Sequence, residues 1–232
     1  MTSTEVIHKF GVPSFSEEIR AFVHHEVPSL HKRDLFSLDR GQFAVFKQFS
    51  RTLPSLRGLK EEVLHDRISS CLPSGSKPAA FSTVLFVQDP HVAESLGVRG
   101  LHPLHFLFAP FNPESIGYRV AQIKVIFQLP AHIQRLRPNA SQVCSHLAYL
   151  ELFTPFAACP KRYCKLQKVE KSVANFRRKA LIIPLNFIYR SCHLIPDWGP
   201  SVDRTWTSAN VLERCNTFHL NSFSDHRMYL FV

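Results

Sequence analysis

The chain has 232 residues, of which 45% are hydrophobic and 20% are charged, and this composition excludes wholesale disorder. Its 28 basic and 18 acidic residues leave a formal net charge of +10, which favours polyanionic partners such as nucleic acid or an acidic protein. The six cysteines match neither a disulfide framework nor a zinc knuckle, and no window approaches about 18 apolar residues. We therefore expect a nuclear or cytoplasmic chain with free thiols and without a membrane span, metal or cofactor.

The first 80 residues are predicted to form a helical extension and a linker. Ser14 and Glu17 match the S-x-x-E capping box, and apolar residues follow at helical spacing until Pro28, which predicts one helix over residues 13–28. Residues 69–80, SSCLPSGSKPAA, have the Ser, Pro and Gly content of a linker or long loop. We therefore expect a domain boundary near residue 80, between units 1–80 and 81–232.

Residues 81–232 are predicted to form an antiparallel β domain. Runs of β-branched and aromatic residues predict strands over residues 83–87, 118–129, 147–153, 163–169, 180–190 and 228–232. Pro184 marks an edge strand or a bulge, Ser208 begins a short helix, and Trp198 and Trp206 line an aromatic groove or anchor the core. The expected fold class is α+β: a small antiparallel β-barrel-like or meander C-terminal domain with a short N-terminal helical extension.

No pattern in the sequence predicts an active site. The eight glycines form neither a phosphate-binding loop nor a nucleophile elbow. Asp225 and His226 are adjacent, so on a strand their side chains point to opposite faces, and Glu151 lies in another predicted strand. Cys159 and Cys164 supply at most one poor half of a zinc site. We expect no enzyme activity, no catalytic residue, no bound metal and no small-molecule substrate.

The densest positive charge lies between residues 161 and 179, where eight basic residues stand against one acidic residue, Glu170, which gives a local charge of +7. Lysine and arginine neutralise phosphates, and Tyr163 and Phe176 supply rings for stacking on bases. The segment therefore predicts a surface for DNA or an acidic partner, with a solvated hairpin as the alternative. The predicted binding residues are Lys161, Arg162, Lys165, Lys168, Lys171, Arg177, Arg178 and Lys179.

Four blocks of the sequence carry a family resemblance through their order and spacing. They read YRVAQIKVIFQLP, HLAYLELFTPF, IIPLNFIYRSCHLIPDWGP and RTWTSANVLERCNTFHLNSFSDHRMYLFV. Together, over about residues 80–232, they resemble the C-terminal portion of proteins encoded by fungal Plavaka and related CACTA-like transposons. The intervening CPKRYCKLQKVEKSVANFRRK departs from the hairpin that is usual in that family. The resemblance implies a transposon-derived nuclear protein whose nuclease domain lies upstream, so no catalytic residue carries over to this chain.

Two functions of different classes agree with these patterns. The first is a non-catalytic C-terminal module of a transposase-like protein, which binds DNA, an acidic partner or the transposase catalytic subunit through the basic segment. The second is an inactive, truncated transposon relic or a self-association fragment without nucleic-acid binding, in which the edge strand at Pro184 and exposed phenylalanines drive pairing.

Overall fold

The structure is a computed structural model and describes residues 1–28, 38, 40–53, 64–87, 118–136, 144–156, 166–199 and 203–224. Its largest unit is a six-stranded sheet of β1 (Ala44–Phe46), β5 (Thr83–Val87), β6 (Tyr118–Gln128), β7 (His146–Leu152), β11 (Ala180–Pro184) and β12 (Ile188–Ser191). All pairings are antiparallel, and the strand order is β11, β7, β6, β5 and β12. On the same edge of β6, β5 pairs with its first half and β1 pairs with its last three residues. Within the described residues β11 does not pair with β12, so the sheet is open. The mixed α and antiparallel β class is confirmed, and the barrel-like closure is not.

The central strand β6 contains a β-bulge, and beyond it odd- and even-numbered side chains exchange faces of the sheet. Its register with β7 shifts between Ile123 and Val125, which leaves Lys124 as the extra residue. Before the bulge, Ile123 packs into the hydrophobic cluster on one face of the sheet. After it, Ile126 belongs to that cluster, whereas Val125 and Phe127 pack on the opposite face. The two halves of the strand thus follow different alternations.

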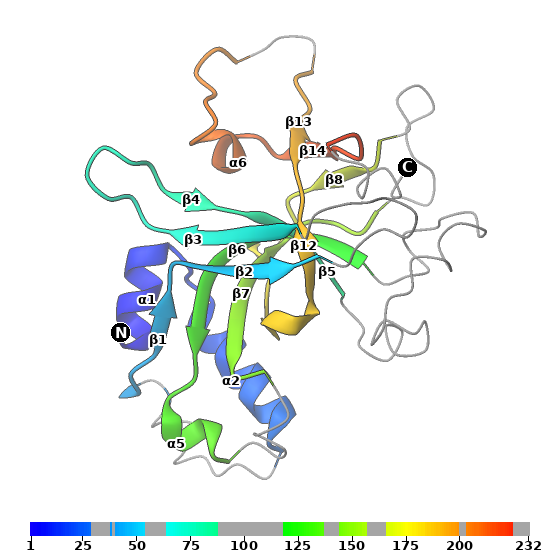
Figure 1. Cartoon of the computed structure of the whole chain (residues 1–232). Helices are drawn as coiled ribbons and strands as arrows, with labels where there is room; N and C mark the ends of the chain where they lie inside the picture. Colours follow the sequence, from blue (N-terminus) through cyan, green and yellow to red (C-terminus); the bar gives the residue numbers. More distant parts are fainter. Residues whose placement is uncertain are drawn as a thin grey trace, which may run out of the picture.

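Two helices, α1 (Ser3–Phe10) and α2 (Phe15–Glu26), cover one face of the main sheet (Figure 1). Thr2 and Glu5 form a capping box at the start of α1, and Gly11, at φ 64°, ends it. Apolar residues of both helices pack on β6, β7 and β11. The hydrophobic cluster that results includes Val6, Phe10, Phe15, Ile19, Val23, Phe127, Leu147, Tyr149 and Ile182.

Helix α2 confirms the predicted helix over residues 13–28, but its predicted capping box is not formed. The Ser14 hydroxyl lies 2.8 Å from the Tyr149 hydroxyl on β7 and makes no capping bond to the backbone of α2. A buried hydroxyl needs a hydrogen-bond partner, and here Tyr149 supplies it. Ser14 therefore ties the helix to the sheet rather than closing its first turn.

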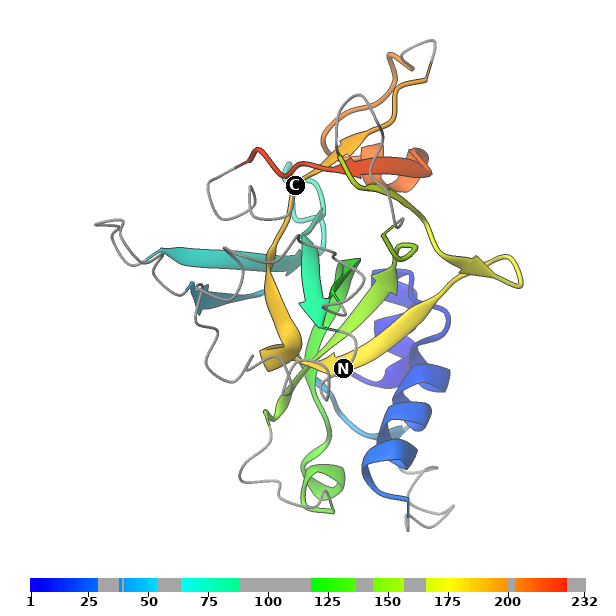
Figure 2. The same cartoon turned by 90° about the vertical axis from the view of Figure 1, so that its right-hand side faces the viewer.

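A second, three-stranded sheet lies on the other side of the main sheet, away from the helices (Figure 2). Its strands are β2 (Gln48–Thr52), β3 (His65–Cys71) and β4 (Ala80–Phe81). The Asp66 carboxylate accepts hydrogen bonds from the Ser191 backbone N–H at 2.5 Å and from its hydroxyl at 2.6 Å. The Ser70 hydroxyl donates to the carbonyl of Lys124 at 2.7 Å. These bonds join β3 to β12 and to the bulge of β6.

Residues 69–80, whose composition is that of a linker or long loop, form the turn of a β-hairpin and the ends of its two strands. They complete β3, turn at Gly75 and enter β4, with Cys71 opposite Ala80. The Ser, Gly and Lys content that suggested a linker belongs to the turn. The part of the chain before residue 80 therefore contains strands as well as helices, and Phe10, which precedes residue 80, shares a hydrophobic cluster with Phe127, which follows it.

A third sheet, at the top of Figure 1, packs on the end of the main sheet. Its strands are β8 (Lys168–Glu170), β14 (Thr217–Leu220) and β13 (Leu194–Pro196). Their apolar face buries Val169, Leu194 and Phe218 with Phe153, and Val211 of α6 (Val211–Arg214) packs beside them. A small hairpin of β9 (Val173–Ala174) and β10 (Arg177–Arg178) connects β8 to β11, and the short helix α5 (Ala131–Gln134) follows β6.

The predicted strands over residues 83–87, 118–129 and 147–153 agree with β5, β6 and β7 to within one residue at each end. The predicted strand over residues 180–190 is divided, because the 3-10 turn η3 (Leu185–Phe187) separates β11 from β12. Proline lacks a backbone N–H, and Pro184 ends β11 at the sheet edge, as predicted. The helix expected from Ser208 begins at Val211. Residues 163–165 and 228–232 lie outside the described residues.

Candidate nucleic-acid interface

The fold divides the predicted basic segment between two places. Lys161, Arg162 and Lys165 lie outside the described residues. The other five predicted binding residues fall into two groups. Lys168 lies on β8 and Lys171 directly follows it. Arg177 and Arg178 form β10, and Lys179 directly follows it. The two groups therefore do not form one continuous surface.

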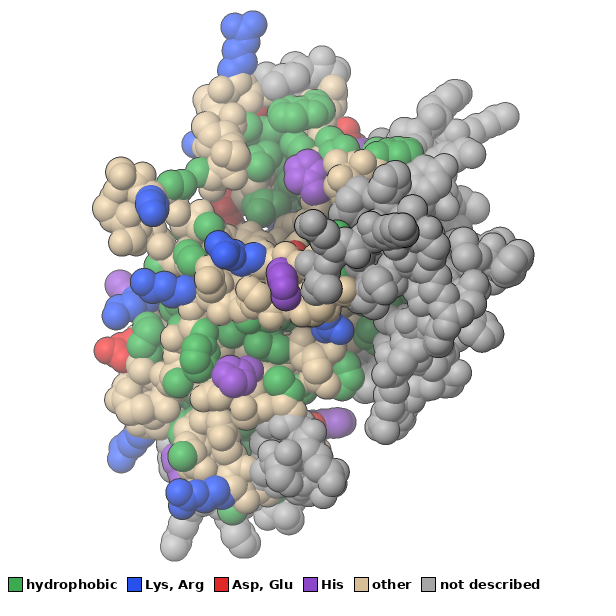
Figure 3. Space-filling model, in the orientation of Figure 1, with side chains coloured by type: hydrophobic (Ala, Val, Ile, Leu, Met, Phe, Trp, Pro, Cys, Tyr) green, Lys and Arg blue, Asp and Glu red, His purple; other side chains and the backbone are tan. Residues whose placement is uncertain are grey.

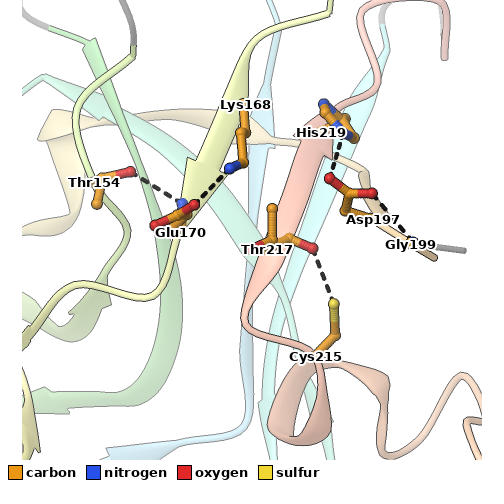
Figure 4. Close-up of polar contacts among 8 residues, drawn as sticks. All are labelled: Thr154, Lys168, Glu170, Asp197, Gly199, Cys215, Thr217 and His219. Atoms are coloured by element: carbon orange, nitrogen blue, oxygen red, sulfur yellow. Dashed lines mark hydrogen bonds and ion pairs between the residues drawn. The ribbon is translucent and has the colours of Figure 1, made fainter. Parts of the chain in front are cut away.

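Lys168 lies on the third sheet next to the acidic side chain of Glu170 (Figure 4). Its Nζ lies 2.7 Å from Oε1 of Glu170, and this hydrogen bond raises the pKa of Lys168. Opposite it on β14, His219 places Nε2 3.4 Å from Oδ2 of Asp197. The cation at Lys168 is already balanced by an acid on its own strand, so we do not include Lys168 in the candidate interface.

Lys171 and Arg178 point towards the protein and anchor the hairpin. Lys171 Nζ donates to the Glu213 carbonyl at 2.6 Å. Arg178 Nη2 donates to the Leu152 carbonyl at 3.0 Å, and its Cζ lies 5.0 Å from the centre of the Phe153 ring. Burial lowers the pKa of both side chains. These two predicted binding residues therefore have structural partners.

Beneath the hairpin lies a buried polar cluster that the sequence patterns did not predict. Lys124, the bulge residue of β6, places Nζ 3.2 Å from Oε1 of Glu213 on α6. Glu151 on β7 is buried, and its pKa is raised because loss of hydration outweighs the attraction of Lys124 and Arg178. A pattern of single residues could not reveal this cluster, because its members come from β6, β7, β10 and α6.

The tip of the β9–β10 hairpin displays an aromatic ring. Ala174 pairs with Arg177, so the loop has two residues, Asn175 and Phe176, with φ angles of 50° and 58°. Positive φ at both positions is the signature of a type I′ turn, which matches the twist of a hairpin. The Phe176 side chain is fully exposed, and Val173 on the neighbouring strand is 56% exposed.

Arg177 and Lys179 are the two described cations of the segment that face solvent and have no ion-pair or hydrogen-bond partner for their side chains. Alternate residues of a strand point to opposite sides, so Arg177 and Lys179 point outwards while Arg178 points inwards. The hairpin projects from the body on the side of α2 (Figure 2). On the opposite face, the described Lys and Arg side chains are scattered singly (Figure 3).

A groove of about 710 Å³ separates the hairpin from the first turn of α2. Arg177 and Lys179 line one wall, and Glu17 and Glu18 line the other. The pKa of Glu18 is raised by burial and by the neighbouring Glu17 carboxylate. Arg177 and Lys179 therefore face an acidic wall across this groove.

Other predicted features have simpler outcomes. Trp198 and Trp206 lie together, with ring centres 5.5 Å apart; Trp198 is exposed and Trp206 packs on the apolar core of the third sheet. Among the described residues, no group of three or more His, Cys, Asp and Glu side chains is placed to hold a metal ion.

Asp225 and His226 lie outside the described residues. Glu151 does not line the groove beside the hairpin.

No family model, curated protein or solved structure matches the chain. The similarity to fungal transposon proteins therefore stays a prediction from the four sequence blocks. In the described residues, none of the helices has the length and apolar character needed to span a bilayer. The candidate interface is consequently defined by its own chemistry: one exposed ring and two unpaired cations on a short hairpin.

Proposed function

We propose that this chain is a non-catalytic DNA-binding module that contacts phosphates through the exposed side chains of Arg177 and Lys179 at the β9–β10 hairpin. The observation that supports this function is that the basic side chains of the hairpin have two different roles. Lys171 and Arg178 hold it to the protein, which leaves Arg177 and Lys179 exposed and without an ion-pair partner among the described residues. The chain's net charge of +10 adds a long-range attraction for a polyanion.

The wider context is part of the same proposal. The four sequence blocks resemble the C-terminal portion of fungal transposon proteins, in which a separate domain carries out the cutting and joining of DNA. A non-catalytic module with a basic hairpin would hold such a protein on its substrate. Contacts to phosphates position a protein on DNA without reading its sequence, so we expect little sequence preference from these two cations.

A charge-reversal experiment tests the proposal. The double variant Arg177→Glu, Lys179→Glu leaves Arg178 in place, so the hairpin keeps its anchor. Its matched control is Arg67→Glu, Lys77→Glu, which reverses two exposed charges on the β3–β4 hairpin, on the opposite side of the molecule (Figure 2). Fluorescence anisotropy with labelled DNA measures the affinity over a range of salt concentrations.

We expect the hairpin variant to lose at least about tenfold in affinity and the control to lose much less, although both change the net charge equally. The slope of log K against log salt should become shallower by about 1.5 to 2, because two phosphate contacts are lost. Equal losses in the two variants would show that only net charge matters. Unchanged binding in the hairpin variant would overturn the proposal.

The exposed apolar side chains of the same hairpin favour one second candidate, self-association. Val173 and Phe176 together present apolar surface that could pair with another copy of the chain. Sedimentation velocity at low and high salt separates the two functions. An oligomer that is insensitive to salt, dissociates on Val173→Ser, Phe176→Ser and retains no DNA would replace the DNA-binding proposal with self-association.

A further inference from the structure

Phe176 occupies an unfavourable position by two criteria. Its ring is fully exposed, so it contributes no packing to the core. Its φ of 58° lies in the left-handed region, which a residue with a large side chain rarely adopts and where glycine is preferred in a type I′ turn. Such strained positions cluster where proteins contact ligands.

We propose that Phe176 is a stacking platform for an unpaired base, so that the ligand of the hairpin is single-stranded nucleic acid; this rests on the proposed function and specifies its substrate. Every base has a flat π face, and stacking on an exposed aromatic ring needs no particular sequence. Next to the ring, Arg177 and Lys179 lie two residues apart on the same side of the strand, about 6.6 Å along it. This spacing suits contacts to neighbouring phosphates of one strand.

The acidic wall of the groove beside the hairpin argues against a duplex. A second strand would bring its phosphates towards α2, where Glu17 and Glu18 line the groove. Their two carboxylates would repel those phosphates. In addition, β9 and β10 have only two residues each, which is too short a ribbon to follow a groove of double-stranded DNA. A single strand has no second backbone to bring against this wall and does not need a long ribbon.

The binding test compares two labelled probes: a single-stranded oligodeoxythymidine of about 20 nucleotides, and the duplex that it forms with oligodeoxyadenosine. This length exceeds the site sizes of most single-strand-binding domains. The key variant is Phe176→Gly, because glycine removes the ring and suits the left-handed turn. Phe176→Trp keeps an aromatic face. The matched control is Phe223→Gly, which removes another exposed phenylalanine ring from a separate part of the surface.

We expect Phe176→Gly to weaken single-strand binding by about 5- to 150-fold, the range that corresponds to one stacked base. Its melting temperature should equal or exceed that of the parent chain, so unfolding would not explain the loss. Phe176→Trp should bind the single strand at least as well as the parent chain, and Phe223→Gly should not affect binding. Equal losses for single strand and duplex, or no loss for either, would overturn the inference.

The two proposals fail in different ways. If Arg177→Glu, Lys179→Glu abolishes binding while Phe176→Gly changes neither probe, the DNA-binding function stands and stacking is wrong. If neither variant affects binding, both are wrong. Anionic phospholipid vesicles provide a further arm, because a ring flanked by cations also suits a membrane surface. Vesicle binding that requires Phe176, without single-strand binding, would replace nucleic acid with lipid.

Discussion

Arg178 lies over the ring of Phe153, with its Cζ 5.0 Å from the ring centre, while Nη2 donates to the carbonyl of the preceding residue, Leu152, at 3.0 Å. Its neighbour Arg177 is exposed and forms no ion pair with an acidic group in the part of the chain that the structure describes. Two adjacent arginines of one short strand therefore have different roles: Arg178 attaches the hairpin to the sheet, and Arg177 remains free for a ligand.

This difference predicts opposite effects of the same substitution. Arg178→Gln should lower the free energy of unfolding by about 1–3 kcal/mol, because it removes a partly buried hydrogen bond to the Leu152 carbonyl and packing on Phe153. Arg177→Gln should change it by less than about 0.5 kcal/mol but weaken DNA binding. Urea denaturation of both variants measures the first quantity, and the reverse ranking would contradict the assigned roles.

Neutralising the acidic wall of the groove should strengthen DNA binding. In Glu17→Gln, Glu18→Gln, two carboxylates opposite Arg177 and Lys179 no longer repel the phosphates held by the hairpin. We expect affinity to rise about two- to fivefold at low salt and the difference to shrink as salt screens the charges. Anisotropy titrations at several salt concentrations measure this change. A fall in affinity would show that these carboxylates contribute to binding rather than opposing it.

Glu151 should make stability depend on pH. Burial raises its pKa above the ordinary value of 4.5, so the folded state favours the protonated form. The stability that this preference supplies is fully present below the ordinary pKa and is lost as pH rises through the raised pKa. Lys124, Arg178 and Lys171 face the carboxyl group and favour its ionisation, whereas Glu213 opposes it.

The variant Glu151→Gln isolates this effect, because its amide is uncharged at every pH. Relative to the parent chain, the variant should gain melting temperature progressively as pH is raised from about 4 to about 8, with little difference at the acidic end. Thermal unfolding followed by circular dichroism provides the measurement. A gain that appears only in acid would mean that the folded pKa is lowered, contrary to the structure.

Residues on both sides of the boundary expected near residue 80 share one hydrophobic cluster. Without α1 and α2, Phe127 and Tyr149 would lose their cover from Phe15 and Ile19. We therefore expect residues 81–232, expressed alone, to bind a hydrophobic dye and to lack a cooperative thermal transition. A sharp transition without dye binding would show that the C-terminal unit folds independently.

Local patterns were sufficient for the elements that local forces determine. The apolar spacing of residues 15–26 and the β-branched content of β5, β6 and β7 predicted their type and most of their bounds. The hairpin over residues 69–80 was missed, because turn and linker have the same composition. A hairpin is distinguished from a linker here by two contacts that the local composition does not reveal. Cys71 pairs with Ala80, and the Ser70 hydroxyl donates a hydrogen bond to the carbonyl of Lys124, which is distant in the sequence.

The candidate interface was predicted as a set of charges but not as a geometry. The sequence identified Arg177, Arg178 and Lys179 as one basic run and Phe176 as a ring suited to stacking. Which of these cations face outwards depends on the two-residue turn and on the position of Phe153, which is brought beside Arg178 by the sheet. The acidic wall at Glu17 and Glu18 comes from the opposite end of the chain and left no local signal.

Because of the bulge at Lys124, β6 should be more sensitive to the deletion of one residue than to a conservative substitution. If one residue were deleted there, regular alternation would be restored and every side chain of one half would turn to the wrong face, including either Ile123 or Phe127. Conservative substitutions on either side should therefore be tolerated more readily than a single-residue gap. Related chains, however divergent, are expected to retain this extra position at the centre of β6.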